Sequence, residues 1–292
     1  MFSGSIVALV TPMTIEGAVD FDALKSLVKW HIEQGTQGIV AVGTTGESAT
    51  LETDEHLAVV KAVCEAANGR IHVIAGNGGS ATHKVVALTE ALDALPIDGF
   101  LTATPAYNKP TQQGLIAHFK AVAKATDKPI VLYNVPGRTA VDMKPQTVAV
   151  LSELNNIVGI KEATGDLVRL ADLQAQVQPG FALLSGDDAT SRAFMLAGGH
   201  GVISVTANVA PKAMRTLCDQ ALAGHGADAL ATDGLIQGLH RSLFIEANPT
   251  PAKWALKRMG VLATDNLRLP LVPLTQAGQA SVEADLKIAG LI

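Results

Sequence analysis

A lysine at the end of a short apolar run is the residue of this chain that most suggests chemistry. In the segment NNIVGIKEATGDL, the run Ile157–Lys161 is typical of a buried strand and ends in Lys161. A buried lysine is costly unless its charge is paired or used. Either its stem packs while the ammonium reaches water, or the neutral amine attacks a carbonyl and forms a Schiff base. A dry site would favour the second by desolvating the ammonium.

Alternation along this run predicts which way the neighbouring side chains point. Ile157 and Gly159 should share a face with Lys161, whereas Glu162 should point the opposite way. Glu162 is therefore not expected to pair with Lys161. Gly159 is expected to leave room beneath the lysine stem.

Imine chemistry also needs a proton relay, and the chain offers two tyrosines for it. Tyr133 ends the preceding apolar run and Tyr107 follows the run before that. A phenol can both donate and accept a proton. Arg138 follows Pro136 and Gly137 in a predicted loop, where its guanidinium suits bidentate binding of a carboxylate.

The segment GTTGES, residues 43–48, offers two hydroxyls and permissive backbone N–H groups before a predicted helix. Such a loop can hold a carboxylate or phosphate, although an ordinary turn has the same composition. It lacks the lysine of a P-loop. The eight histidines show no H-x-H or H-E-x-x-H spacing, and GNGGS lacks the third glycine of a dinucleotide fingerprint. Neither a metal nor a nucleotide cofactor is predicted.

Eight short apolar runs must position these residues, and amphipathic segments separate them. The runs are Ser5–Val10, Gly38–Val42, His72–Ala75, Gly99–Ala103, Ile130–Tyr133, Ile157–Lys161, Phe181–Leu184 and Gly201–Val205. This alternation predicts a (β/α)8 TIM barrel, with a doubly wound open sheet as the alternative. Small, polar and ionisable residues follow the runs, as expected for chemistry at the C-terminal end of a barrel.

Helical spacing is clearest at Phe21, Leu24, Leu27, Val28 and His31. Two helix starts carry capping signals. Thr53, followed by Asp54 and Glu55, is typical of a capped, acidic first turn, and Asp187 or Asp188 could cap the helix that ends near Gly198.

The strand pattern stops after about residue 224. The segments GLIQGLHRSLFIEANPTPAKWALKRMG and AGQASVEADLKIAGLI are typical of helices. We therefore predict a catalytic barrel over residues 1–224 and a C-terminal helical domain over residues 225–292.

Composition excludes several classes of partner. The net charge is −5 and no basic run occurs, so nucleic acid is not an expected partner. Cys64 and Cys218 lie in predicted helices without metal spacing, which favours packed thiols in a reducing compartment. The N-terminus has no signal-peptide pattern, and the longest uncharged stretch, residues 193–211, contains glycines and a proline. A cytoplasmic protein without membrane contact is expected.

Several motifs together resemble one known family. They are GSIVALVTPM, VGTTGESATL, YNVPGRT, GIKEATGD, LLSGDDAT and GVISVTANVAP. Over nearly the whole chain they are similar to the 4-hydroxy-tetrahydrodipicolinate (dihydrodipicolinate) synthases, class I pyruvate-dependent aldolases related to N-acetylneuraminate lyase. The arginine in YNVPGRT is the feature associated with the synthases rather than with the sialic-acid lyase.

The resemblance implies a lyase that condenses pyruvate with L-aspartate-4-semialdehyde in the diaminopimelate route to lysine, without a metal or organic cofactor. Lys161 would form the pyruvate imine. Tyr133 would relay protons with Thr44 and with Tyr107 from a neighbouring subunit. Substrate binding would use Thr45 for the pyruvate carboxylate, Arg138 for the semialdehyde carboxylate, and the backbone carbonyls of Gly186 and Ile203. A homotetramer, built as a dimer of dimers, is implied.

One departure from the family concerns feedback inhibition. In lysine-inhibited relatives the effector cleft would correspond to Ser48, Ala49, His56 and positions 53, 80, 84 and 106. Those relatives have His, Asn, Glu and Tyr at the last four, where this chain has Thr53, Ser80, Lys84 and Ala106. Lys84 would repel a lysine ligand, and a unit-charge pair at about 4 Å is worth about 4 kcal/mol at an effective dielectric of 20. Weak or absent inhibition by lysine is predicted.

Three other interpretations were compatible with parts of the pattern. One is a different pyruvate-dependent aldolase, such as a sialic-acid or keto-sugar-acid lyase, against which Arg138 argues. Another is a binding or regulatory barrel that lost its chemistry, against which the intact reactive set argues. The third is an open sheet with Lys161 on the surface.

Overall fold

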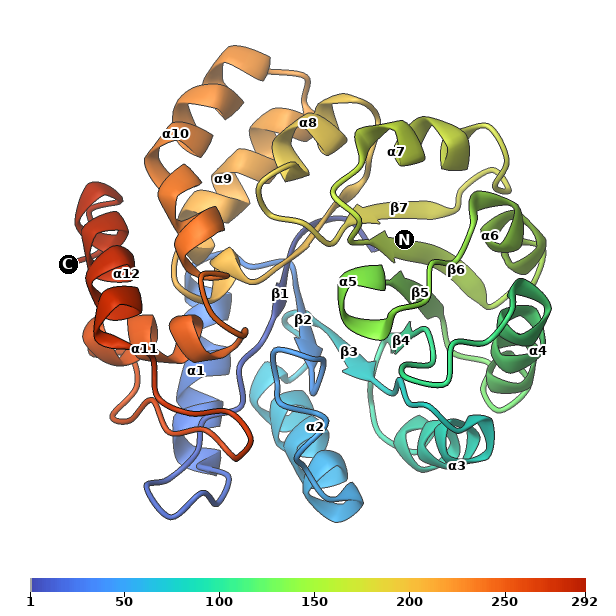
Figure 1. Cartoon of the computed structure of the whole chain (residues 1–292), viewed down its shortest axis with the longest axis horizontal. Coiled ribbons are helices and arrows are strands. Elements are labelled where there is room, and N and C mark those ends of the chain that lie inside the picture. The colour runs from blue at the N-terminus through green and yellow to red at the C-terminus, as the bar shows by residue number, and fades with distance from the viewer. Residues whose placement is uncertain (1) are drawn as a thin grey trace.

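Eight parallel strands close into a barrel in the computed structural model, which describes residues 2–292 (Figure 1). The strands pair in sequence order, and β1 also pairs with β8. Their bounds are β1 Gly4–Ala8, β2 Gly38–Ala41, β3 His72–Gly76, β4 Gly99–Ala103, β5 Ile130–Asn134, β6 Ile157–Glu162, β7 Ala182–Ser185 and β8 Gly201–Ser204. The predicted TIM barrel is confirmed, and the open sheet is excluded because no strand edge remains.

Helices surround this barrel and alternate with its strands (Figure 1). They are α1 Phe21–Glu33, α2 Thr53–Ala67, α3 Thr82–Asp93, α4 Gln112–Ala123, α5 Pro136–Thr139, α6 Pro145–Ser152, α7 Leu167–Gln174, α8 Ser191–Leu196 and α9 Pro211–Leu222, with the 3-10 turn η1 at Thr206–Asn208. In α1, Leu24, Leu27, Val28 and His31 are buried as their spacing predicts. Cys64 and Cys218 are buried free thiols within α2 and α9.

Three further helices lie on one side of the barrel, against α1 and α9 in Figure 1. These are α10 Gly226–Ser242, α11 Thr250–Arg258 and α12 Gln276–Ile288. The predicted helical extension is therefore present, but the segment containing Asn248 and Pro249 interrupts its first part. Leu239 of α10 and Leu286 of α12 belong to the same hydrophobic cluster as the barrel helices, so burial of apolar surface attaches the extension to the barrel.

Two helix starts differ from the predictions. Thr53 is the first residue of α2 rather than its cap, and the N–H of Glu52 binds the Glu55 carboxylate at 3.0 Å. Thr190 is the N-cap residue of α8, and of the two predicted aspartates Asp187 supports this helix start, because its carboxylate accepts the N–H of Thr190 at 3.0 Å. The Asp188 carboxylate instead accepts the N–H groups of Val205 and Thr206, both at 2.9 Å. It thereby ties the end of β7 to the end of β8.

A bulge in β6 changes the predicted alternation. Ile130 pairs with Ile157 but Val131 pairs with Gly159, which leaves Val158 as an extra residue. Ile157 consequently belongs to the hydrophobic cluster between the strands and the surrounding helices. The prediction that it shares a face with Lys161 is therefore wrong. Beyond the bulge the alternation holds, and Lys161 and Glu162 point in opposite directions.

Gly159 has a role different from the predicted one. A Cβ at this position would lie 2.7 Å from the carbonyl oxygen and 2.8 Å from the Cβ of Ala182 on β7. Its missing side chain therefore allows close approach of β6 and β7, not the passage of the lysine stem.

We predict that Gly159→Ala lowers the free energy of unfolding by about 1–3 kcal/mol, the usual cost of overpacking. Gly234→Ala in α10 is the matched control, because nothing lies within 4 Å of the added methyl. That change should raise stability by up to about 1 kcal/mol, since alanine favours a helix. Urea unfolding of both variants measures the difference. Equal midpoints would contradict the close-packing role of Gly159.

Candidate active site

The C-terminal ends of the strands enclose a small cavity, here called the inner cavity, of about 210 Å³. Six of the predicted site residues line it: Thr44, Thr45, Tyr133, Arg138, Lys161 and Gly186. Residues that the sequence did not single out also line it, among them Asp187, Phe244 and Asn248. The strand ends and the C-terminal extension thus form the site together.

Lys161 is buried in this cavity without a counter-ion. Its exposed fraction is 5%, and none of the ion pairs among residues 2–292 involves it. Its Nζ lies 4.3 Å from the centroid of the Tyr133 ring, because the two residues are paired across β5 and β6. The ring face attracts an ammonium, whereas burial disfavours it. An amine held this way is available for covalent chemistry.

Lys253 of α11 offers a contrast within the same chain. Its side chain is 1% exposed, but its Nζ forms an ion pair with Glu47 and donates to the carbonyl of Asn266 at 2.8 Å. Burial lowers the pKa of Lys253, and the charge of Glu47 partly offsets this effect. A buried lysine with a carboxylate partner is structural. Sequence reasoning missed it, because its partner lies in a distant part of the chain.

Glu47 belongs to the GTTGES loop, whose backbone is strained. Val42 and Glu47 have φ values of 54° and 59°, in the left-handed region that β-branched and bulky residues avoid. Gly76 makes this possible, because a Cβ there would lie 2.3 Å from the Val42 carbonyl oxygen. The Glu47 carboxylate is bound by Lys253 and by the N–H of Arg268 at 3.1 Å. The extension therefore fixes the loop that carries Thr44 and Thr45.

Thr45 is oriented by a residue of the extension. The Nδ2 of Asn248 donates to the Thr45 hydroxyl oxygen at 2.9 Å. Because this oxygen already accepts, the single hydroxyl proton of Thr45 remains available to donate to a bound anion. The sequence signal for Asn248 was weak, namely a polar residue before Pro249 that breaks a helical pattern.

Gly186 provides the space that the lysine needs. A Cβ at this position would lie 2.9 Å from Cε and 3.0 Å from Cγ of Lys161. Gly186 also anchors its strand end, since its N–H donates to the Glu162 carbonyl at 2.7 Å. The room for the lysine stem thus comes from β7 and not from β6.

Two predicted site residues lie outside the wall of the inner cavity. Ile203 is buried among the side chains of the barrel interior. Tyr107 is 93% exposed and has a φ of 73°, an uncommon conformation for an aromatic residue. It lines neither of the two cavities described in this subsection, and its side chain is open to solvent in the single chain.

A second cavity of about 460 Å³, the outer cavity, shares part of its wall with the inner one. Thr44, Tyr133 and Arg138 line both. The predicted effector residues that line the outer cavity are Ser48, Ala49, Thr53, His56, Ser80 and Ala106. Lys84 is exposed and is not part of its wall.

His56 contributes no positive charge to the outer cavity near neutral pH. Burial lowers the pKa of His56 to about 4, and a backbone hydrogen bond at Gly76 only partly offsets this. Its buried Nε2 has no hydrogen-bond partner among residues 2–292.

Neither a metal site nor a membrane-spanning helix is found in the part of the chain that the structure describes. Within residues 2–292, no three His, Cys, Asp or Glu side chains are grouped as a metal site would require. Among the helices of this described part of the chain, none is long and apolar enough to cross a bilayer. Burial raises the pKa of the Cys64 thiol to about 11, so that it stays protonated and unreactive.

A family model agrees with this geometry. The model described as the Dihydrodipicolinate synthetase family matches residues 1–289. The chain belongs to this family. Its members of known name include the 4-hydroxy-tetrahydrodipicolinate synthase of Laribacter hongkongensis, 56% identical over the full length of both chains. The chain is accordingly an enzyme, a lyase of the class I aldolase type.

Solved structures of the family are closely similar. The chloride-inhibited dihydrodipicolinate synthase of Acinetobacter baumannii, in complex with pyruvate, has a TM-score of 0.98 at 50% identity and full coverage of both chains. A monomeric dihydrodipicolinate synthase variant has a TM-score of 0.97 at 39% identity, covering 100% of this chain and 98% of its own. The same fold therefore occurs in a monomeric variant of the family.

We predict that Lys253→Met destabilises the fold by about 3–5 kcal/mol, because it leaves the buried Glu47 carboxylate unpaired. Lys257→Met on the same helix is the matched control. Lys257 is half-exposed and pairs with Asp265 at the surface, so its loss should cost about 0–1 kcal/mol. Denaturant unfolding measures both. A similar loss for the two variants would show that the buried pair does not stabilise the loop.

Proposed function

We propose that this chain condenses pyruvate with L-aspartate-4-semialdehyde through a Schiff base on Lys161, forming 4-hydroxy-tetrahydrodipicolinate in lysine biosynthesis through diaminopimelate. The observation that carries the proposal is a buried amine without a counter-ion, set over Tyr133 in a cavity bounded by Thr45 and Arg138. The names of relatives that match over their full length support the reaction.

The first half-reaction uses the pyruvate carboxylate for orientation. The Thr45 hydroxyl donates to this carboxylate, which presents the keto carbon to Lys161. The neutral amine attacks that carbon, and the carbinolamine then loses water to leave an imine. Tyr133 and Thr44 border the reacting atoms and relay the protons that attack and dehydration require.

In the second half-reaction the imine acts as an electron sink. The pyruvate methyl group loses a proton, and the resulting enamine carbon attacks the aldehyde of the semialdehyde. Arg138 binds the carboxylate of this second substrate as a charged fork. The amino group of the semialdehyde then displaces Lys161 from the imine carbon, which closes the ring and regenerates the free amine.

Tyr107 joins this relay from a second copy of the chain in our proposal. Its exposed, strained position suits a residue whose contacts are made across an interface. A homotetramer built as a dimer of dimers would supply that copy. We also propose a cytoplasmic location, where the substrates of amino-acid biosynthesis are found.

Trapping with borohydride tests the mechanism. Incubation with pyruvate and reduction should add one reduced pyruvyl group to Lys161, located by peptide mass mapping. Lys253 is the internal control, since it is buried but paired with Glu47 and should stay unmodified. Lys161→Ala should abolish the adduct and turnover. An adduct on another lysine would contradict the proposal, and so would the absence of any adduct in enzyme that is active.

We further propose that lysine inhibits this enzyme weakly or not at all. The outer cavity lacks the aromatic wall of inhibited relatives, because Ala106 occupies that position. Lys84, which replaces their acidic residue, is exposed outside the wall of this cavity and offers no negative charge to a lysine ligand. His56 is neutral, so it neither attracts nor repels the ligand.

Steady-state assays with L-lysine should accordingly show no inhibition below the millimolar range. The combined variant T53H/S80N/K84E/A106Y should gain sensitivity, since it restores the polar, acidic and aromatic contacts. An inhibition constant for L-lysine below the millimolar range with the unaltered enzyme would refute this prediction.

A further inference from the structure

Arg138 is carried by a short loop, residues 135–142, which we call the arginine loop. The loop contains α5 and ends at Asp142. Within residues 2–292 its guanidinium takes part in no ion pair. Arg138 is also exposed, so its guanidinium is available to an anion. Because no ion pair fixes this side chain, its position depends on how the backbone of the loop is held.

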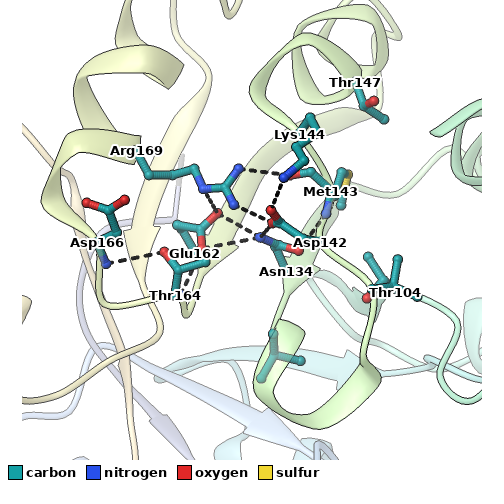
Figure 2. Close-up of polar contacts among 12 residues, drawn as sticks. Thr104, Asn134, Asp142, Met143, Lys144, Thr147, Glu162, Thr164, Asp166 and Arg169 are labelled. Carbon is teal, nitrogen blue, oxygen red and sulfur yellow. Dashed lines mark hydrogen bonds and ion pairs between the residues drawn. The ribbon is translucent and has the colours of Figure 1, made fainter. Parts of the chain in front are cut away.

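Asn134, the residue between Tyr133 and the loop, closes the loop at its base. Its Oδ1 accepts the N–H of Met143 at 2.9 Å, and its Nδ2 donates to the Asp142 carboxylate at 3.1 Å (Figure 2). The side chain of one residue therefore joins the two ends of the arginine loop. Asn134 is fully buried, so water does not compete for these hydrogen bonds.

The same amide also reaches the strand that carries Lys161. Its Nδ2 lies 3.1 Å and 3.3 Å from the two carboxylate oxygens of Glu162, and Figure 2 shows the three polar side chains meeting at one point. Arg169 lies against both carboxylates, bound to Asp142 and 3.7 Å from Glu162. Asn134 and Arg169 thus both connect the Lys161 strand to the far end of the loop, but only the backbone of Asn134 also leads directly into the near end.

The chemistry of this position requires an amide. The nitrogen faces two carboxylates and must donate, while the oxygen faces an N–H and must accept. An aspartate of the same shape would place a third carboxylate against Glu162 and Asp142. Burial raises the pKa of Glu162, and hydrogen bonds from Asn134 and Thr164 partly offset this. These donors therefore favour the carboxylate form of Glu162.

The strands and the loop differ in their dependence on Asn134. Backbone pairing holds Tyr133 beside Lys161, and the Ala163 N–H donates to the Asn134 carbonyl at 2.9 Å whatever the side chain. Apart from Asn134, side-chain contacts hold the loop rather than strand pairing. Thr104 donates to Thr139 at 3.2 Å, and Gln112 donates to the Asp142 carbonyl at 2.9 Å. The Asp142 carboxylate also pairs with Lys144 and Arg169. The loop also holds Ala140 at a φ of 56°, which needs support from its surroundings.

We propose that Asn134 is a positioning residue that sets the arginine loop for the carboxylate-bearing aldehyde acceptor, and that formation of the pyruvate adduct does not depend on it. This inference rests on the proposed function. It assigns to Asn134 the selective support of the second substrate through Arg138.

Three variants test the inference. Asn134→Ala removes the hydrogen bonds of the amide to Asp142, Met143 and Glu162. Asn134→Asp replaces the N–H donor by a carboxylate oxygen. Asp142→Ala removes the carboxylate that Asn134 binds at the far end of the loop and changes no strand residue. Each should raise KM for L-aspartate-4-semialdehyde roughly tenfold to a hundredfold, the scale of a misplaced binding group. KM for pyruvate and the rate of borohydride trapping should stay within about threefold of the unaltered enzyme.

Lys144→Gln is the matched control. Lys144 binds the same Asp142 carboxylate from the exposed side, at 2.6 Å, and does not contact Asn134. Its substitution should leave both KM values unchanged. Trapping by each variant also reports that its inner cavity is folded.

Two outcomes would overturn the inference. One is an unchanged acceptor KM in Asn134→Ala and Asp142→Ala. The other is an equal loss of trapping and of acceptor binding, which would mean that Asn134 supports the whole site. Failure of the unaltered enzyme to trap pyruvate would instead count against the proposed function.

Discussion

The chemistry that we propose depends on one constraint, the burial of an amine at a strand end with no carboxylate beside it. Lys161 and Lys253 are both almost inaccessible to water, but only Lys253 has an ion-pair partner. The paired lysine ties a loop to a helix and has no reactive role. The unpaired one lies over an aromatic ring in a cavity. The same residue type thus serves structure or reaction according to its partner.

Closure of the barrel brings the C-terminal ends of the strands together. Three further features position the lysine side chain, the GTTGES loop and the arginine loop, which strand pairing does not hold. The bulge in β6 and the missing side chain of Gly186 set the path of the lysine. The extension fixes the GTTGES loop through Lys253 and orients Thr45 through Asn248. The amide of Asn134 closes the arginine loop. The segment beyond residue 224 therefore helps to form the candidate site.

The two cavities share Thr44, Tyr133 and Arg138, so whatever occupies the outer one borders the reactive residues. The two strained residues, Val42 and Glu47, flank Gly43 and Thr44, which line both cavities. Buried partners hold the GTTGES loop in a conformation that the isolated segment would avoid. Its rigidity is a property of the assembled fold rather than of its own sequence.

The sequence by itself determined the barrel and a candidate reactive set. Short apolar runs predict the strands, and the residues that follow them reach the same rim, so Lys161, Tyr133 and Arg138 could be proposed from type and position. Only the tertiary structure decided how they are held. Asn248 and Thr45 are 203 residues apart, and Lys253 and Glu47 are 206 apart. No local pattern encodes such pairs, because the two partners come into contact only when the barrel closes and water is excluded from between them.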